Sequence, residues 1–138
     1  MESPILESLY MSDSSPSVPP IVLWQRVEGA LLFATGILLF WQGGHDFSVW
    51  QALVIFFVPD LSMLGYALGP KVGAFCYNTV HVYAFGASLL AAGLIGSLPD
   101  LAAVGALWLA HSGFDRMLGY GLKSALGFAF THLGKIGR

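Results

Sequence analysis

Long apolar runs constrain this chain more than any other feature of its sequence. A helix needs about 20 mostly apolar residues to cross the hydrocarbon core of a bilayer, and four segments reach that length. Breaks that contain glycine, proline or aspartate separate them, at residues 43–46, 69–70 and 99–100. The predicted spans cover residues 20–42, 49–68, 72–98 and 101–120. We therefore predict an all-α fold, a four-span antiparallel transmembrane helix bundle.

The composition agrees with a membrane protein. Of the 138 residues, 56% are hydrophobic and 10% are charged, whereas soluble domains average about 25% charged residues. The net charge is −2 and the basic residues are scattered, so the chain offers no basic patch for nucleic acid. The single cysteine, Cys76, excludes an intramolecular disulfide. The predicted partner is the lipid bilayer.

Two segments flank the predicted bundle. Residues 1–19 are rich in serine and proline and lack the basic start of a signal peptide, which predicts a polar tail without a fold of its own. Residues 121–138 place apolar side chains at helical intervals and basic side chains beside them, which predicts a short C-terminal amphipathic helix at the membrane interface. The predicted organisation is a tail over 1–19, a membrane domain over 20–120 and an interfacial tail over 121–138.

The basic residues predict the orientation of the spans. Arg26 lies near the start of the first span, Lys71 lies between the second and third, and further basic residues follow the fourth. The loops around residues 43–46 and 99–100 contain no lysine or arginine. The positive-inside rule then places both termini in the cytoplasm.

Six polar residues interrupt the spans at a similar depth. At 1.5 Å per residue they lie roughly 10–18 Å from the predicted cytoplasmic ends of their helices. Asn78 and His81 are three positions apart and His111 and Asp115 are four apart, so each pair shares a helical face. Ionisable groups at such depth normally face the bundle interior and pair with one another. The six are Glu28, Asp60, Asn78, His81, His111 and Asp115.

Glycine and proline predict local geometry within the spans. The glycines of the four spans are predicted points of close helix packing. Pro59 cannot donate a hydrogen bond to the carbonyl of Ile55, which predicts a kink beside Asp60.

The chain carries four motifs, "RVEG" at 26–29, "VPDLSMLGYALGPKVGAFCYNTVHVY" at 58–83, "WLAHSGFDRMLGYGLK" at 108–123 and "THLGKIG" at 131–137. By these motifs it resembles, from about Leu23 onward, the small bacterial integral-membrane proteins of domain of unknown function 4260. The resemblance implies four spans in a bacterial cytoplasmic (inner) membrane. It implies no mechanism, so the function has to be argued from the residues.

Imidazole and carboxylate together form the usual ligand set of Zn, Mn and non-haem Fe, and four-helix di-iron proteins collect such ligands from facing helices. We predict a divalent metal, Zn, Fe or Mn, in a metal-dependent membrane enzyme, a hydrolase or oxidoreductase with a lipidic or otherwise hydrophobic substrate. Four tyrosines could hydrogen-bond the site, although packing is the simpler role for each: Tyr66, Tyr77, Tyr83 and Tyr120. The predicted ligands are Glu28, Asp60, His81, His111 and Asp115, with Glu28, Asp60 and Asp115 also as acid or base groups. The surrounding cofactor-binding residues are Asn78, Tyr66, Arg116 and Tyr120.

Other interpretations of the same residues stay open. A metal-free polar network would hold the helices together through interhelical hydrogen bonds, and a chain of acidic and histidine side chains can carry protons or ions. Haem ligated by His81 and His111 fits less well, because three carboxylates would surround the porphyrin. A non-catalytic chain would be a subunit of a larger membrane complex or a homo-oligomer.

Overall fold

The structure is a computed structural model that describes residues 19–137. The predicted N-terminal tail lies outside the described residues except for Pro19. The described chain is mainly helical and ends in three short strands. The helices are α2 (Pro20–Gln42), α3 (Val49–Phe57), the 3₁₀ helix η1 (Val58–Leu68), α4 (Pro70–His81), α5 (Tyr83–Ile95) and α6 (Pro99–Leu118), and the strands are β1 (Lys123–Ser124), β2 (Gly127–Thr131) and β3 (Gly134–Lys135).

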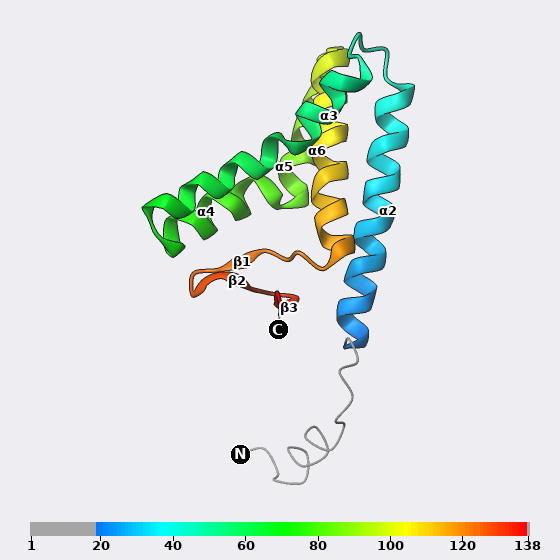
Figure 1. Cartoon of the computed structure of the whole chain (residues 1–138). Coiled ribbons are helices and arrows are strands. Elements are labelled where there is room, and N and C mark those ends of the chain that lie inside the picture. The colour runs from blue at the N-terminus through cyan, green and yellow to red at the C-terminus, as the bar shows by residue number, and fades with distance from the viewer. Residues whose placement is uncertain (1–18, 138) are drawn as a thin grey trace, which may run out of the picture.

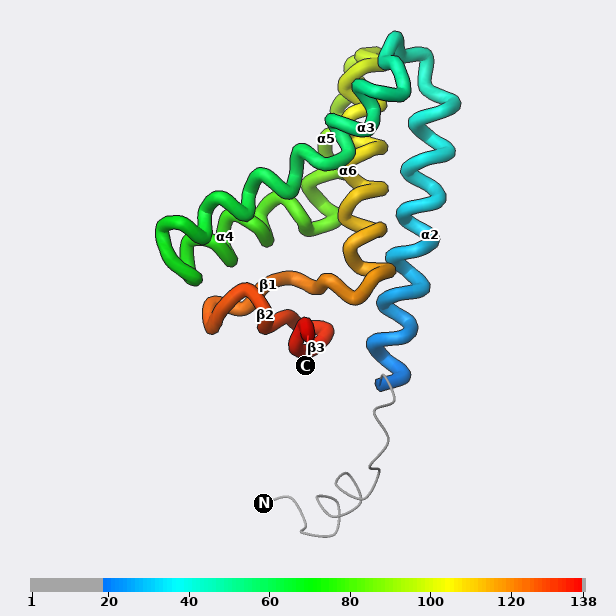
Figure 2. Tube along the Cα trace, in the orientation of Figure 1, coloured from blue at the N-terminus to red at the C-terminus, as the bar shows by residue number. Residues whose placement is uncertain are grey.

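Helix α6 lies at the centre of the fold. Helices α2 and α5 both pack along it, and α3 packs against its first half (Figure 1). Helices η1 and α4 form a second pair that leans away from α2 and α6, as the trace in Figure 2 shows. The predicted four-span antiparallel bundle is therefore confirmed only as a mainly helical fold, because one helix pair diverges from the other helices.

Glycines allow α6 to approach both neighbours closely. A Cβ atom on Gly36 of α2 would lie 2.6 Å from the Ala106 carbonyl oxygen of α6. On Gly93 of α5 it would lie within contact distance of the Ala102 backbone, and on Gly29 it would meet the carbonyl of Gly113 at 2.7 Å. At these positions the sequence-based prediction of close packing points is confirmed, and backbone approaches backbone without an intervening side chain.

The third predicted span is bent. Helices α4 and α5 meet at 41°, because Val82 between them has extended backbone angles, φ −70° and ψ 139°. The break removes the Val80 carbonyl from the helical hydrogen-bond ladder, and the Trp108 indole N–H of α6 donates to it at 2.7 Å. A break whose freed backbone groups find protein partners is compatible with a membrane interior.

The second predicted span changes its helical type halfway. The α-helical hydrogen bonding of α3 ends at Phe57, and η1 continues as a 3₁₀ helix from Val58. Pro59 lies at this change and has no N–H to donate. The kink predicted beside Asp60 is therefore seen as a change from α-helical to 3₁₀ hydrogen bonding. Runs of 3₁₀ helix this long are uncommon, and η1 carries Asp60.

Two helices are long and apolar enough to cross a membrane, Pro20–Gln42 and Val49–Leu68, and the bent pair α4 and α5 adds a third candidate span. Their outer surfaces are apolar, with Trp24 70% exposed and Trp50 74% exposed. These features indicate a membrane protein. Within residues 19–137, α6 is not among the candidate spans, so a fourth span is not confirmed.

The predicted C-terminal amphipathic helix is wrong. Strands β1, β2 and β3 form an antiparallel sheet in chain order, and β2 alternates half-buried with exposed residues. Gly127 and Gly134 have φ angles of 147° and 115°, which L-residues rarely adopt and which no helix accommodates. These glycines turn the chain where the apolar spacing alone predicted a helix.

The C-terminus of α6 is closed by a Schellman motif. The Tyr120 N–H donates to the Asp115 carbonyl at 2.8 Å and the Gly119 N–H to the Arg116 carbonyl at 3.0 Å. Gly119 has a φ of 95° in the left-handed region, as this motif requires. The helix therefore ends at Leu118, and the chain turns back beneath η1 and α4.

Replacing Gly36 by alanine should destabilise the protein by about 1–3 kcal/mol, because the added methyl group overpacks the α2–α6 contact. Thermal unfolding of detergent-purified protein measures this. The matched control is Gly44→Ala, since a Cβ at Gly44 meets nothing within 4 Å. Equal unfolding temperatures for the two variants would contradict the proposed close packing.

Candidate metal centre

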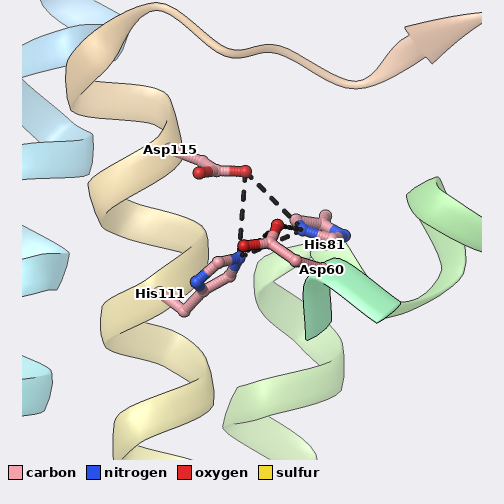
Figure 3. Close-up of side chains that lie close together, drawn as sticks. All are labelled: Asp60, His81, His111 and Asp115. Carbon is pink, nitrogen blue, oxygen red and sulfur yellow. Dashed lines mark hydrogen bonds and ion pairs between the residues drawn. The ribbon is translucent and has the colours of Figure 1, made fainter. Parts of the chain in front are cut away.

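Four side chains converge where η1, α4 and α6 meet, and we call them the Asp/His cluster. Asp60 comes from η1, His81 is the last residue of α4, and His111 and Asp115 lie one turn apart on α6 (Figure 3). One ligand atom from each lies within 4.8 Å of all the others. His81 is 2% and His111 1% exposed. The structure thus brings together four of the five predicted metal ligands.

The distances within the Asp/His cluster resemble those of a four-ligand metal site. The two histidine Nε2 atoms lie 3.2 Å apart. Asp60 Oδ1 lies 3.4 Å from His111 Nε2 and 3.7 Å from His81 Nε2, and Asp115 Oδ2 lies 3.6 Å from His81 Nε2 and 3.9 Å from His111 Nε2. Ligands bonded at 2.0–2.1 Å in a tetrahedron are roughly 3.3 Å apart. These five distances are therefore close to those of an occupied tetrahedral site, and all four ligand atoms lie within 4.8 Å of one another.

A hydrogen bond to the backbone orients the His81 ring. Its Nδ1 lies 2.8 Å from the Tyr77 carbonyl, and because a carbonyl only accepts, Nδ1 donates. The ring also stacks on the Tyr77 side chain, with centroids 3.6 Å apart and planes at 11°. In the neutral ring the Nε2 lone pair then points into the cluster, which is the arrangement of metal-binding histidines.

Tyr77 also orients Asp115. Its hydroxyl donates to Asp115 Oδ2 at 2.6 Å, and the side chain is 1% exposed. Among Tyr66, Tyr77, Tyr83 and Tyr120, Tyr77 is the one that bonds the cluster. It lies four residues before His81 and so shares its helical face, a spacing that distinguishes it from Tyr66 and Tyr120.

Glu28 does not join the cluster. It is exposed on α2 and lines a separate pocket with Arg116. The neighbouring Gly29 is the residue that meets α6, near Arg116 and Gly113, so the α2 contact covers a different face of α6 from the one that bears His111 and Asp115. The depth predicted for Glu28 did not fix its direction around the helix.

All four predicted surrounding residues lie elsewhere or at the margin, and Arg116 lines the separate pocket with Glu28. The Tyr66 ring packs against Phe128 and over Gly73, and its hydroxyl has no hydrogen-bond partner among the described residues. Tyr120 lines the cavity beside the cluster. Asn78 Nδ2 donates to the Lys123 carbonyl at 2.8 Å, and the Lys123 N–H donates to Asn78 Oδ1 at 2.7 Å. These two hydrogen bonds with Asn78 therefore hold β1 against α4.

A cavity of about 400 Å³ adjoins the Asp/His cluster. Asp60, His111 and Asp115 form its polar wall, and apolar side chains such as Met63 and Phe114 form much of the remainder. The cluster therefore faces a space in which an apolar molecule can lie.

Lys123 adds a buried cation to the cavity wall. It is 5% exposed, and its ammonium lies 3.8 Å from the centroid of the Phe128 ring and 5.0 Å from that of Tyr77. Burial lowers the pKa of Lys123, while the nearby Asp115 carboxylate raises it. Sequence analysis missed this residue, because an amphipathic helix would have placed Lys123 in the headgroup region.

One family model matches residues 22–136, nearly all of the described chain. The chain belongs to the family described as Domain of unknown function (DUF4260). This confirms the resemblance inferred from the four motifs. No curated protein and no solved structure shows significant similarity to it. The DUF4260 description assigns no activity, so the Asp/His cluster and its cavity carry the functional argument.

Replacing Asn78 by alanine should release β1 from α4, because both hydrogen bonds to the Lys123 backbone are lost, each worth about 1 kcal/mol. Amide hydrogen exchange over residues 123–131 should become faster. Thr79→Ala is the control, since Thr79 bonds only the Phe75 carbonyl within α4. Unchanged exchange in Asn78→Ala would show that other contacts hold the sheet in place.

Proposed function

We propose that this chain is a metal-dependent membrane enzyme that acts on a lipidic or otherwise hydrophobic substrate. The observation that carries the proposal is the spacing of the Asp/His cluster, four ligand atoms within 4.8 Å of one another. Two imidazoles and two carboxylates suit Zn, Fe or Mn. Haem is not proposed, because the carboxylates of Asp60 and Asp115 each lie within 4 Å of both imidazole Nε2 atoms and occupy the space that a porphyrin would need.

The adjoining cavity supports the class of substrate. Its wall includes Phe57, Leu118 and Phe128, which are 52%, 48% and 43% exposed, so the cavity opens to the molecular surface. That surface belongs to a protein with two or three candidate membrane spans. An acyl chain or another apolar group can therefore enter from the bilayer and bring a polar group to the cluster.

The residues divide into ligands and a base. His81, His111 and Asp60 have the shortest mutual distances and are the proposed ligands. Asp115 lies farther than Asp60 from His111 Nε2, at 3.9 Å against 3.4 Å, and its Oδ2 accepts a hydrogen bond from Tyr77, so it is the proposed proton acceptor. A divalent metal held by these residues would supply a Lewis acid. The Lys123 ammonium on the same wall balances negative charge in the cavity.

One observation favours the metal-free polar network. His81 Nε2 and His111 Nε2 are within hydrogen-bond distance of each other, and His111 Nδ1 has no partner among residues 19–137. A ligating histidine normally donates its other N–H to the protein. The corresponding function is that of a non-catalytic subunit, in a larger membrane complex or a homo-oligomer, whose helices the network holds in register.

Metal content separates the two functions. Protein purified in detergent should contain one divalent metal ion per chain by elemental analysis, and His81→Gln and His111→Gln should each lose it while staying folded. Glu28→Gln and His45→Gln are the controls and should keep the metal, because neither residue belongs to the cluster. The network predicts instead a metal-free parent and a His111→Gln variant with nearly unchanged stability, since such bonds are worth about 0.6 kcal/mol in membranes.

Turnover tests the enzymatic part of the same proposal. Metal-loaded protein is incubated with vesicles of bacterial lipid extract, and the lipids are analysed by mass spectrometry. Asp115→Asn should retain the metal and lose at least 100-fold in any turnover that the parent shows, because general base catalysis contributes about 10²–10⁴-fold. Loaded parent protein that alters no lipid of the extract would contradict a lipid-directed enzyme.

We also propose a bacterial cytoplasmic membrane with both termini in the cytoplasm. Arg26 supports this, because its Nε donates to the Met117 carbonyl at 2.9 Å, which places the start of α2 beside the end of α6 and the C-terminal basic residues. A C-terminal cysteine label should therefore be inaccessible to a membrane-impermeant reagent in intact cells. Labelling from outside would reverse the orientation.

A further inference from the structure

Arg116 carries a buried charge on a different face of α6 from the Asp/His cluster. Its side chain is 6% exposed. Its guanidinium lies 3.5 Å from a ring nitrogen of His132 and 5.4 Å from the centroid of the Tyr83 ring. Arg116 forms no ion pair among residues 19–137, because the ion pairs there all join His81 or His111 to Asp60 or Asp115. Burying a charge without a partner is costly. The position therefore calls for an anion.

The contact with His132 does not satisfy Arg116. The Leu122 N–H donates to His132 Nδ1 at 2.9 Å, so a neutral His132 ring carries its proton on Nε2. Burial and the charge of Arg116 lower the pKa of His132, which keeps the ring neutral at physiological pH. Two N–H donors, from Arg116 Nη1 and His132 Nε2, therefore face each other at 3.5 Å. An acceptor atom beside both would satisfy them.

A third donor faces the same space. A pocket of about 280 Å³ is lined by Tyr83, Arg116 and His132 together with Gln25 and Glu28 of α2. The Tyr83 hydroxyl is buried and has no hydrogen-bond partner among the described residues. Donors from α5, α6 and the C-terminal segment thus converge on one pocket, and charge-assisted bonds from such donors are the strongest that an oxyanion can accept.

The pocket lies beside the first turns of α2, near one end of a candidate membrane span. Gln25 and Glu28 follow Pro20, the first residue of α2, by five and eight positions, or about 8–12 Å along the helix. Trp24, 70% exposed on the same part of α2, is a residue type enriched at membrane–water interfaces, which supports a lipid headgroup as the source of the anion.

We propose that this pocket binds a membrane phospholipid by its headgroup, with Arg116, His132 Nε2 and Tyr83 Oη donating to the phosphate. Glu28 is the one carboxylate among the residues that line the pocket, and it pairs with a cationic group on the same headgroup. The ligand is therefore a zwitterionic lipid of the phosphoethanolamine type. The site is separate from the Asp/His cluster and does not depend on a metal there.

Native mass spectrometry tests the proposal. The protein is extracted from vesicles that contain equal amounts of phosphatidylethanolamine and phosphatidylglycerol. The parent should retain one phosphatidylethanolamine per chain. Arg116→Gln should reduce that retention at least tenfold, and Tyr83→Phe, which removes only the hydroxyl, by several-fold. The control is Lys71→Gln, a change of an exposed cation far along the chain from the pocket, which should retain the lipid as the parent does.

Glu28→Gln provides the readout that a purely structural role would not move. It should keep a bound lipid but shift the preference toward phosphatidylglycerol, because the carboxylate that attracts the ammonium is lost. If Arg116→Gln fails to fold, Tyr83→Phe and Glu28→Gln still decide the outcome. Equal lipid retention in the parent and both of these variants would overturn the proposal.

A second arm separates a lipid from a free phosphate. Delipidated protein is titrated with inorganic phosphate and, separately, with phosphatidylethanolamine in detergent, and its thermal unfolding is followed. The lipid should raise the unfolding temperature of the parent and not of Arg116→Gln. An increase of the same size with inorganic phosphate alone would overturn the lipid assignment and leave an inorganic anion site. Metal content is measured on the same samples, so a failure of the proposed enzyme is recognised independently.

Discussion

The close approach of α6 to α2 and α5 is the contact on which the rest of the structure depends. Gly36 and Gly93 bring neighbouring backbones against α6 at distances that exclude any side chain. In lipid, helices gain little from apolar burial against one another, and contacts between small residues therefore decide their association. Because α6 is enclosed in this way, its polar side chains face other protein elements. A helix at the edge of the fold would expose the same residues to hydrocarbon.

The opposite charges of Asp115 and Arg116 on α6 face different neighbouring elements. Asp115 and Arg116 are adjacent in sequence and so point about 100° apart around the helix. Asp115 faces η1 and α4, where Tyr77 bonds it, and Arg116 faces α2 and the C-terminal segment, where Glu28 and His132 line the pocket. The two opposite charges are thus directed to two different sites of the protein.

The sequence predicts part of the site because local spacing carries directional information. His111 and Asp115 had to share a face of one helix, and the structure places both in the cluster. Glu28 shared only their depth, and depth leaves the direction around a helix undetermined. Lys123 and His132 could not be placed from sequence, because their positions depend on a sheet that is turned at Gly127 and Gly134. The apolar spacing of residues 121–138 fits a helix equally well, so it does not reveal the sheet.

The 3₁₀ winding of η1 changes how far its segment reaches. A 3₁₀ helix rises about 2.0 Å per residue against 1.5 Å in an α-helix. The 20 residues of Val49–Leu68 therefore extend roughly 35 Å, where an α-helix would extend about 30 Å. The hydrocarbon core is about 30 Å thick, and a longer segment is accommodated by tilting. The inclined course of η1 beside the upright α2 and α6 (Figure 1) agrees with such a length mismatch. A uniform α-helical winding would remove the mismatch and, because η1 also carries Asp60, would change the direction of that side chain around the helix.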